Sequence, residues 1–139
     1  MTSIYLDDIR TPIEHPNGGE WTIVRNCEDF IATVSKIGLE KIDIISFDHD
    51  LDWSATVHFF DHTRQTYEVD YTMIKERTGM DAVKWMIREA RSKSMELPQC
   101  YVHSANPIGS GNMIGYINMY LKEIRKPQTC IRANWKHNK

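Results

Sequence analysis

The sequence lacks an excess of positive charge. Its 17 Lys and Arg residues against 19 Asp and Glu residues give a formal net charge of −2. Proteins that bind long stretches of nucleic acid through the phosphate backbone are normally basic. We therefore expect no binding to an extended nucleic acid, whereas a single nucleotide or the end of an RNA is compatible with this charge.

Cysteine is scarce, and long hydrophobic runs are absent. The three cysteines, Cys27, Cys100 and Cys130, are widely spaced and odd in number, which argues against a disulfide framework and a zinc site. No apolar run approaches the roughly 20 residues of a membrane span. No basic segment followed by an apolar stretch opens the sequence. We expect a cytoplasmic protein with no membrane partner.

The length of 139 residues and the ordinary share of hydrophobic residues, 41%, fit one domain over residues 1–139. Short apolar runs predict strands at 4–6, 21–24, 42–47, 100–102 and 129–133. Helical spacing of apolar residues predicts a helix at 26–38, with Asn26 as its N-cap and Gly38 at its C-cap. The same spacing predicts a helix at 78–90 that opens with a capping box at Thr78 and Asp81, and a helix from a turn at 109–112 to Pro127. This alternation predicts an α/β fold, a small doubly wound parallel sheet covered on both faces.

The segment from Trp53 to Arg77 interrupts the alternation. Residues 56–60 and 66–71 alternate roughly by two, and the five residues between them are polar. We therefore predict a β-hairpin insertion over residues 53–77, beside the C-terminal edge of the sheet. Its aromatic residues indicate either a small satellite core or a lid that stacks a base.

Polar side chains follow three of the predicted strands. In open α/β sheets, ligands bind outside the carboxyl ends of the strands, so these side chains are expected on one rim. The candidate residues are Asp7, Asp8, Arg10, Asp48, His49, Asp50, His103, Ser104 and Asn106. Clustered carboxylates hold a hard cation such as Mg²⁺ or Mn²⁺, or they orient a histidine. His49 and His103 suit general acid–base work, in which one takes a proton and the other gives one.

A short glycine-rich turn is expected to complete the rim. It consists of Gly109, Ser110, Gly111 and Asn112, which lead onto a helix N-terminus where backbone N–H groups favour an anion. Together with the positive charge of Arg10, this turn suits a phosphate. The residues therefore indicate phosphoester chemistry.

Four motifs, in this order, resemble the cyclic-phosphate-processing receiver-like family over residues 3–125. They are Leu6-Asp7-Asp8-Ile9-Arg10-Thr11-Pro12, Ser46-Phe47-Asp48-His49-Asp50-Leu51, Thr78-Gly79, and His103-Ser104-Ala105-Asn106-Pro107-Ile108-Gly109 with Asn112-Met113. The resemblance implies a receiver-like (flavodoxin-like) sheet. It also implies that Asp7 and Asp8 match the acidic pair that binds Mg²⁺ in receivers, that Asp48 matches the phosphoacceptor position, and that Ser104 lies near the small hydroxyl residue.

The sequence also departs from true receivers. His49 and Asp50 follow Asp48, and a loop rich in Pro and Gly replaces the usual first helix. Lys126 precedes the last strand, so the receiver lysine has no match. These departures argue against ordinary phosphorelay signalling.

Two functions fit these residues. The first is a phosphoesterase that opens a cyclic phosphate of a nucleotide or RNA end, in which His49 and His103 move protons and Asp48 or Asp50 orients His49. In that enzyme Arg10, Ser104, Asn106 and residues 109–112 bind the substrate, and a Mg²⁺ or Mn²⁺ ion held by Asp7, Asp8 and Asp48 replaces or assists the proton chemistry. The second is a receiver-like module that binds or sequesters a nucleotide without turnover. The family includes phage proteins, so the resemblance also implies a counter-defence protein that acts on cyclic nucleotide signals and, if a phage encodes it, is located in the host cytoplasm.

Overall fold

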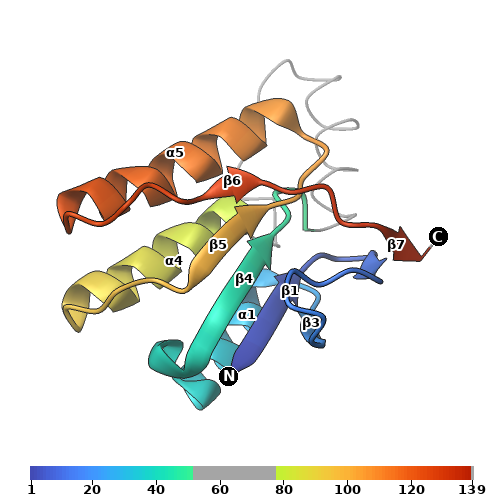
Figure 1. Ribbon diagram of the computed structural model, residues 1–139, viewed down its shortest axis with the longest axis horizontal. Coiled ribbons are helices and arrows are strands. Elements are labelled where there is room, and N and C mark those ends of the chain that lie inside the picture. Colours follow the sequence, from blue (N-terminus) through green and yellow to red (C-terminus); the bar gives the residue numbers. More distant parts are fainter. Residues whose placement is uncertain (52–77, 139) are drawn as a thin grey trace, which may run out of the picture.

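A five-stranded parallel sheet forms the centre of the molecule (Figure 1). The computed structural model describes residues 1–51 and 78–138, so the expected hairpin at 53–77 lies outside the described residues. The strands, in spatial order, are β3 (Trp21–Val24), β1 (Thr2–Leu6), β4 (Ile42–Phe47), β5 (Gln99–Val102) and β6 (Ile131–Arg132). This is the strand order of receiver-like, flavodoxin-type folds, and it confirms the predicted α/β class.

Three helices connect the strands: α1 (Cys27–Ile37), α4 (Gly79–Ser92) and α5 (Pro107–Glu123), with a short 3₁₀ helix η1 (Leu39–Lys41) after α1. As expected, Asn26 caps the start of α1 by accepting a hydrogen bond from the Asp29 N–H, and Gly38 ends it with φ +96°. Thr78 and Asp81 form the expected capping box of α4, in which the Thr78 N–H donates to Asp81 Oδ2 at 3.0 Å.

The three helices pack on one face of the sheet. The chain moves in one direction from β3 to β4, β5 and β6, and right-handed connections then place each helix on the same side. Side chains of alternate strand residues, such as Ile4, Leu6 and Phe47, join the helices in one apolar core. Both faces of the sheet are covered, as predicted, but among the described residues helices cover only this one.

Loop and C-terminal residues cover the other face. The step from β1 to β3 runs opposite to the later steps, so residues 7–20 cross the second face. Aromatic rings fill this side: Tyr5 packs edge-on against Trp21, and Trp135 does the same against Trp21 and Tyr101. Two short antiparallel strands, β2 (Thr11–Pro12) and β7 (His137–Asn138), join the loop to the C-terminus.

The start of α5 differs from the expectation. We predicted a glycine-rich turn at 109–112, but α5 begins at Pro107 with Asn106 as its cap. Proline is favoured in the first turn of a helix because it has no N–H to leave unpaired, and this signal outweighs the glycines. No helix of the described residues is long and apolar enough to span a membrane.

Gly79 is required where α4 begins, because a Cβ there would overlap the carbonyl oxygen of Asp48. We predict that Gly79→Ala lowers the free energy of unfolding by about 1–3 kcal/mol, the usual cost of overpacking. The matched control is Gly115→Ala in α5, where a Cβ meets open space. Alanine there should raise stability by up to about 1 kcal/mol. Urea denaturation measures both, and equal effects would refute the close contact.

Candidate active site

Backbone hydrogen bonds continue past the ends of the central strands and bring the site residues into register. The Asp7 N–H donates to the Val24 carbonyl at 3.1 Å, the Asp48 N–H to the Leu6 carbonyl at 2.9 Å, and the His103 N–H to the Phe47 carbonyl at 2.9 Å. Asp7, Asp48 and His103 therefore lie side by side at the C-terminal edge of the sheet, where the sequence predicted them.

Asp7 is fully buried, and both of its carboxylate oxygens are occupied. Oδ1 accepts from the backbone N–H groups of Ile9 (3.0 Å) and Arg10 (2.9 Å). Oδ2 accepts from Arg10 Nε at 2.7 Å and lies 3.1 Å from His103 Nε2. Burial alone would raise the pKa of Asp7, but these donors and the Arg10 charge lower it to about 2.

Arg10 joins two buried acids. While its Nε contacts Asp7, its Nη2 lies 3.4 Å from Asp48 Oδ1. The Arg10 side chain is about one-quarter exposed, so the residue faces the acids while part of its side chain remains accessible. Arg10 thus supplies the positive charge that the two carboxylates need when no other cation is present.

Asp48 is buried but less fully compensated. Burial raises its pKa to about 6, and the charge of Asp7 adds to the rise. Arg10, the His49 N–H at 2.8 Å and the Ser104 hydroxyl act in the opposite direction. The pKa of Asp8 is also raised, first by burial and then by the Asp7 charge.

Asp7, Asp8 and Asp48 could hold a divalent ion. Each offers a carboxylate oxygen, and these oxygens lie within 4.8 Å of one another. An all-carboxylate set suits a hard cation such as Mg²⁺ or Mn²⁺. The raised pKa values of Asp8 and Asp48 indicate uncompensated negative charge that a cation would relieve, so the residues fit the group, with Arg10 as its competitor.

The two histidines of the site are placed differently. The His103 side chain is 2% exposed, it stacks on the Tyr5 ring at 4.1 Å, and its Nδ1 lies 2.7 Å from Ser46 Oγ. With Nε2 at Asp7, neither ring nitrogen is free. Burial lowers the pKa of His103, against the effect of Asp7.

His49 keeps an accessible ring. Its side chain is 20% exposed, and its Nδ1 lies 2.8 Å from Asp50 Oδ1. The ring packs against Gly109 of α5, where a Cβ would collide with it. Because Asp50 contacts Nδ1 and no described residue hydrogen-bonds to Nε2, the Nε2 atom is the ring nitrogen that could act on a ligand.

The residues expected to bind substrate are partly engaged within the protein. The Asn106 side chain accepts from the Gly109 N–H at 2.9 Å, and the Ser110 N–H donates to the Asn106 carbonyl. Ser110 is buried, and its hydroxyl donates to the Ser104 carbonyl at 3.2 Å. We predicted that backbone N–H groups of residues 109–112 bind an anion. Two of these N–H groups, those of Gly109 and Ser110, instead donate to Asn106.

Sequence reasoning missed residues that support the site from outside the motifs. Arg25 donates to the carbonyls of Arg10 (2.7 Å) and Asp7 (3.2 Å) and so fixes the loop after β1. An arginine just before a helix cap gives no sequence signal of this contact. His15, in the loop between β2 and β3, contacts Ser3 Oγ at 2.9 Å and packs on Trp21.

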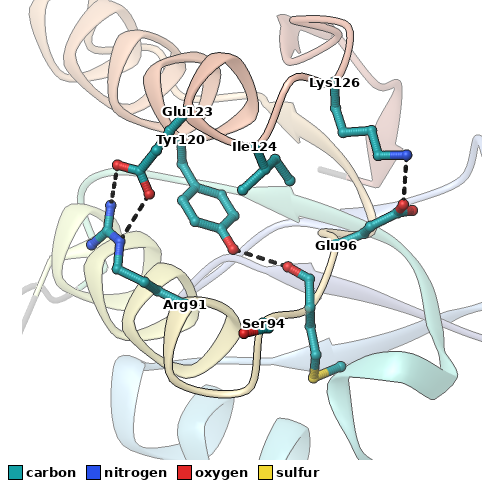
Figure 2. Close-up of a pocket in the computed structure, with 8 residues that line it drawn as sticks. Arg91, Ser94, Glu96, Tyr120, Glu123, Ile124 and Lys126 are labelled. Carbon is teal, nitrogen blue, oxygen red and sulfur yellow. Dashed lines mark hydrogen bonds and ion pairs between the residues drawn. The ribbon is translucent and has the colours of Figure 1, made fainter.

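A hollow at the C-terminal ends of α4 and α5 has a volume of about 380 Å³ (Figure 2). Arg91 forms an ion pair with Glu123 there, Lys126 forms one with Glu96, and the Tyr120 hydroxyl donates to the Met95 carbonyl. The charged groups of this hollow pair with one another. They therefore leave less charge for a ligand than Asp7, Asp8 and Asp48 do at the C-terminal edge of the sheet, which we call the acidic edge.

The pKa of Asp48 makes a prediction about stability. The pKa is about 6 in the folded protein against 3.8 for an unperturbed group, so between pH 4 and 6 the folded state binds more protons than the unfolded chain. The contribution of Asp48 to the free energy of unfolding therefore falls as pH rises through that range. Above pH 6, the free energy of unfolding of Asp48→Asn should exceed that of the wild type by something on the order of 2 kcal/mol. The difference should vanish near pH 4.

The control for this prediction is Asp7→Asn, which should behave in the opposite way. Its lowered pKa stabilises the fold above pH 4, so the variant should be less stable than the wild type at neutral pH and approach it as pH falls toward 2. Urea denaturation in EDTA across this range measures both variants. Destabilisation by Asp48→Asn at pH 7 would contradict the assignment.

Comparison with known protein families supports the receiver-like fold. The family model of the cyclic-phosphate processing receiver domain matches residues 2–119. Searches of curated proteins and of solved structures found no match. The matched range contains every residue of the acidic edge and ends before β6. A match over most of the sequence, together with the receiver-like sheet, shows that the chain belongs to the cyclic-phosphate processing receiver domain family.

Proposed function

We propose that the protein is a phosphoesterase that opens a cyclic phosphate of a nucleotide or of an RNA end. The observation that carries this proposal is the accessible His49 ring, oriented by Asp50, beside a buried cluster of acids and Arg10. A module that only binds a nucleotide needs a phosphate-binding cation, but it does not need an oriented histidine. The family name supports a cyclic phosphate as the group that is processed.

His49 is the proposed proton acceptor. Water attacks the phosphorus, one ring P–O bond breaks, the water proton passes to His49 Nε2, and the released ribose oxygen takes a proton from solvent. The Asp50 contact at Nδ1 favours the tautomer in which Nε2 is free to accept. His103 was expected to give the second proton, but both of its nitrogens are bonded, so we assign it a positioning role.

Asp7, Asp8 and Asp48 are the proposed ligands of Mg²⁺ or Mn²⁺. When bound, such an ion would neutralise charge on the phosphoryl oxygens. Asp8 and Asp48 are the better ligands, because four N–H donors already occupy the Asp7 oxygens. Asp7 then acts mainly by holding Arg10.

Arg10 is the proposed phosphate-binding residue. Its side chain is partly exposed, and Arg is suited to bidentate contact with phosphate oxygens. Ser104, Asn106 and residues 109–112 stay as proposed neighbours of the substrate, with Asn106 and Ser104 shaping the start of α5 rather than forming a separate cradle.

The test of the function is incubation of purified protein with cyclic mononucleotides and RNAs ending in a cyclic phosphate, with Mg²⁺, with Mn²⁺ or with EDTA. We expect one class to be opened to a phosphomonoester. Tight binding without turnover under all three conditions would refute the enzyme and support the binding module. Turnover that persists in EDTA would exclude the metal and leave His49 and Arg10.

We predict that His49→Ala lowers kcat roughly 10²–10⁴-fold, the usual contribution of one proton-transfer group, with little change in KM. Asp50→Asn should lower kcat by a smaller factor, because it only loosens the ring. The matched control is Asp43→Asn, near the other end of β4, whose carboxylate accepts from Ser3. It should retain the wild-type rate. Steady-state kinetics measure all three, and wild-type kcat in His49→Ala would remove the proposed role.

Arg10→Gln should change two affinities in opposite directions. Loss of the guanidinium removes a competing cation from Asp7 and Asp48, so Mn²⁺ should bind more tightly, by about tenfold or less. Loss of the same charge should weaken binding of inorganic phosphate. Calorimetry or Mn²⁺ electron paramagnetic resonance measures the first and calorimetry the second. Weaker binding of both ligands would show that Arg10 supports the acids structurally and does not compete for them.

A further inference from the structure

The C-terminal segment reaches the candidate site although the family match ends at residue 119. After β6, the Ala133 N–H donates to the Val102 carbonyl at 2.9 Å, directly beside His103. The chain then crosses the helix-free face of the sheet and pairs with the loop after β1, where the Ile13 N–H donates to the Lys136 carbonyl at 2.8 Å. Trp135 lies between these two anchors (Figure 1 shows β7 beyond the end of β1).

Trp135 is held firmly over this face. Its ring packs edge-on against Tyr101 at 5.1 Å and against Trp21 at 5.7 Å. Its indole Nε1–H donates to Ser46 Oγ at 2.8 Å. Ser46 is fully buried in β4, so this hydrogen bond forms inside the protein.

The contact continues from Ser46 to the acidic edge. Ser46 Oγ lies 2.7 Å from His103 Nδ1, and His103 Nε2 lies 3.1 Å from Asp7 Oδ2. Three successive hydrogen bonds therefore link the indole of Trp135 to the carboxylate that holds Arg10.

The donors in this chain point one way. An indole N–H can only donate, so Ser46 accepts from Trp135, which leaves its hydroxyl proton available to donate to His103 Nδ1. The Asp7 carboxylate can only accept, so His103 Nε2 must carry a proton toward it. Both requirements are met by the neutral His103 tautomer that is protonated at Nε2.

We propose that Trp135 is a positioning residue of the site: through Ser46 it fixes the tautomer and orientation of His103, which in turn holds the Asp7 carboxylate. This inference rests on the proposed function for its consequence, because Asp7 orients Arg10 and contributes to the cation site. Outer partners of metal-binding and catalytic groups commonly affect affinity or activity 10–100-fold.

The test compares Trp135→Phe with Trp21→Phe. Both changes remove an indole N–H from the same aromatic cluster, but Trp21 donates to the Glu14 carbonyl, outside the chain to His103. Ser46→Ala is the second variant, because it removes the link without altering an aromatic ring. Urea denaturation identifies conditions under which each protein is folded.

The deciding measurements are the ¹⁵N signals of the His103 ring and the ¹³C signal of the Asp7 carboxyl, neither of which needs a substrate or a metal. In the wild type and in Trp21→Phe we expect a protonated Nε2 and an unprotonated Nδ1. In Trp135→Phe and Ser46→Ala we expect both the His103 and the Asp7 signals to shift. Affinity for Mn²⁺, or for inorganic phosphate if Mn²⁺ does not bind, should fall about tenfold in these two variants only.

Unchanged His103 and Asp7 signals in Trp135→Phe and Ser46→Ala would overturn the proposal, as would equal changes in Trp21→Phe. Signals that shift while the affinities stay at wild-type values would also overturn it, because the contact would then have no effect on the site. If the wild type turns over no cyclic phosphate, the proposed enzyme fails, but these signals and affinities still decide the role of Trp135.

Discussion

The site depends on one buried carboxylate. Asp7 has no exposure to solvent, and a charge in that position is tolerated only when each oxygen is hydrogen-bonded. Two backbone N–H groups, Arg10 and His103 supply those bonds. Because three of these donors lie in the loop after β1 and the fourth follows β5, the single requirement of Asp7 fixes that loop, the Arg10 side chain and the end of β5.

Arg10 and the acids form a balanced but incomplete set of charges. Arg10 compensates Asp7 well, which helps to lower the pKa of Asp7, while Asp48 keeps a raised pKa because it is buried and close to the Asp7 charge, with the guanidinium farther away. Such a cluster could hold a cation at its acids and, in the proposed function, a phosphate at its arginine. That dual capacity suits a phosphate together with a divalent ion, the two groups that phosphoester chemistry brings together.

The two faces of the sheet contribute differently to the site. The helical face supplies the apolar core and places the first turn of α5 against His49, which explains why glycine occupies position 109. The other face carries aromatic rings and the polar chain from Trp135 to Asp7. Hence one face supports the histidine that is accessible, and the other supports the histidine that is buried.

The sequence by itself determined the α/β class, most element positions and the edge where Asp7, Asp48 and His103 meet, because burial periodicity and the polar ends of parallel strands are local signals. It also located the caps at Asn26, Gly38 and Thr78. Only the tertiary structure decided that His103 is bonded on both nitrogens, that Arg10 bridges two acids, and that Arg25 and Trp135 support them. These contacts join residues as far apart as Ser46 and Trp135, and a hydrogen bond between distant residues depends on how the strands and loops pack, which no local pattern encodes.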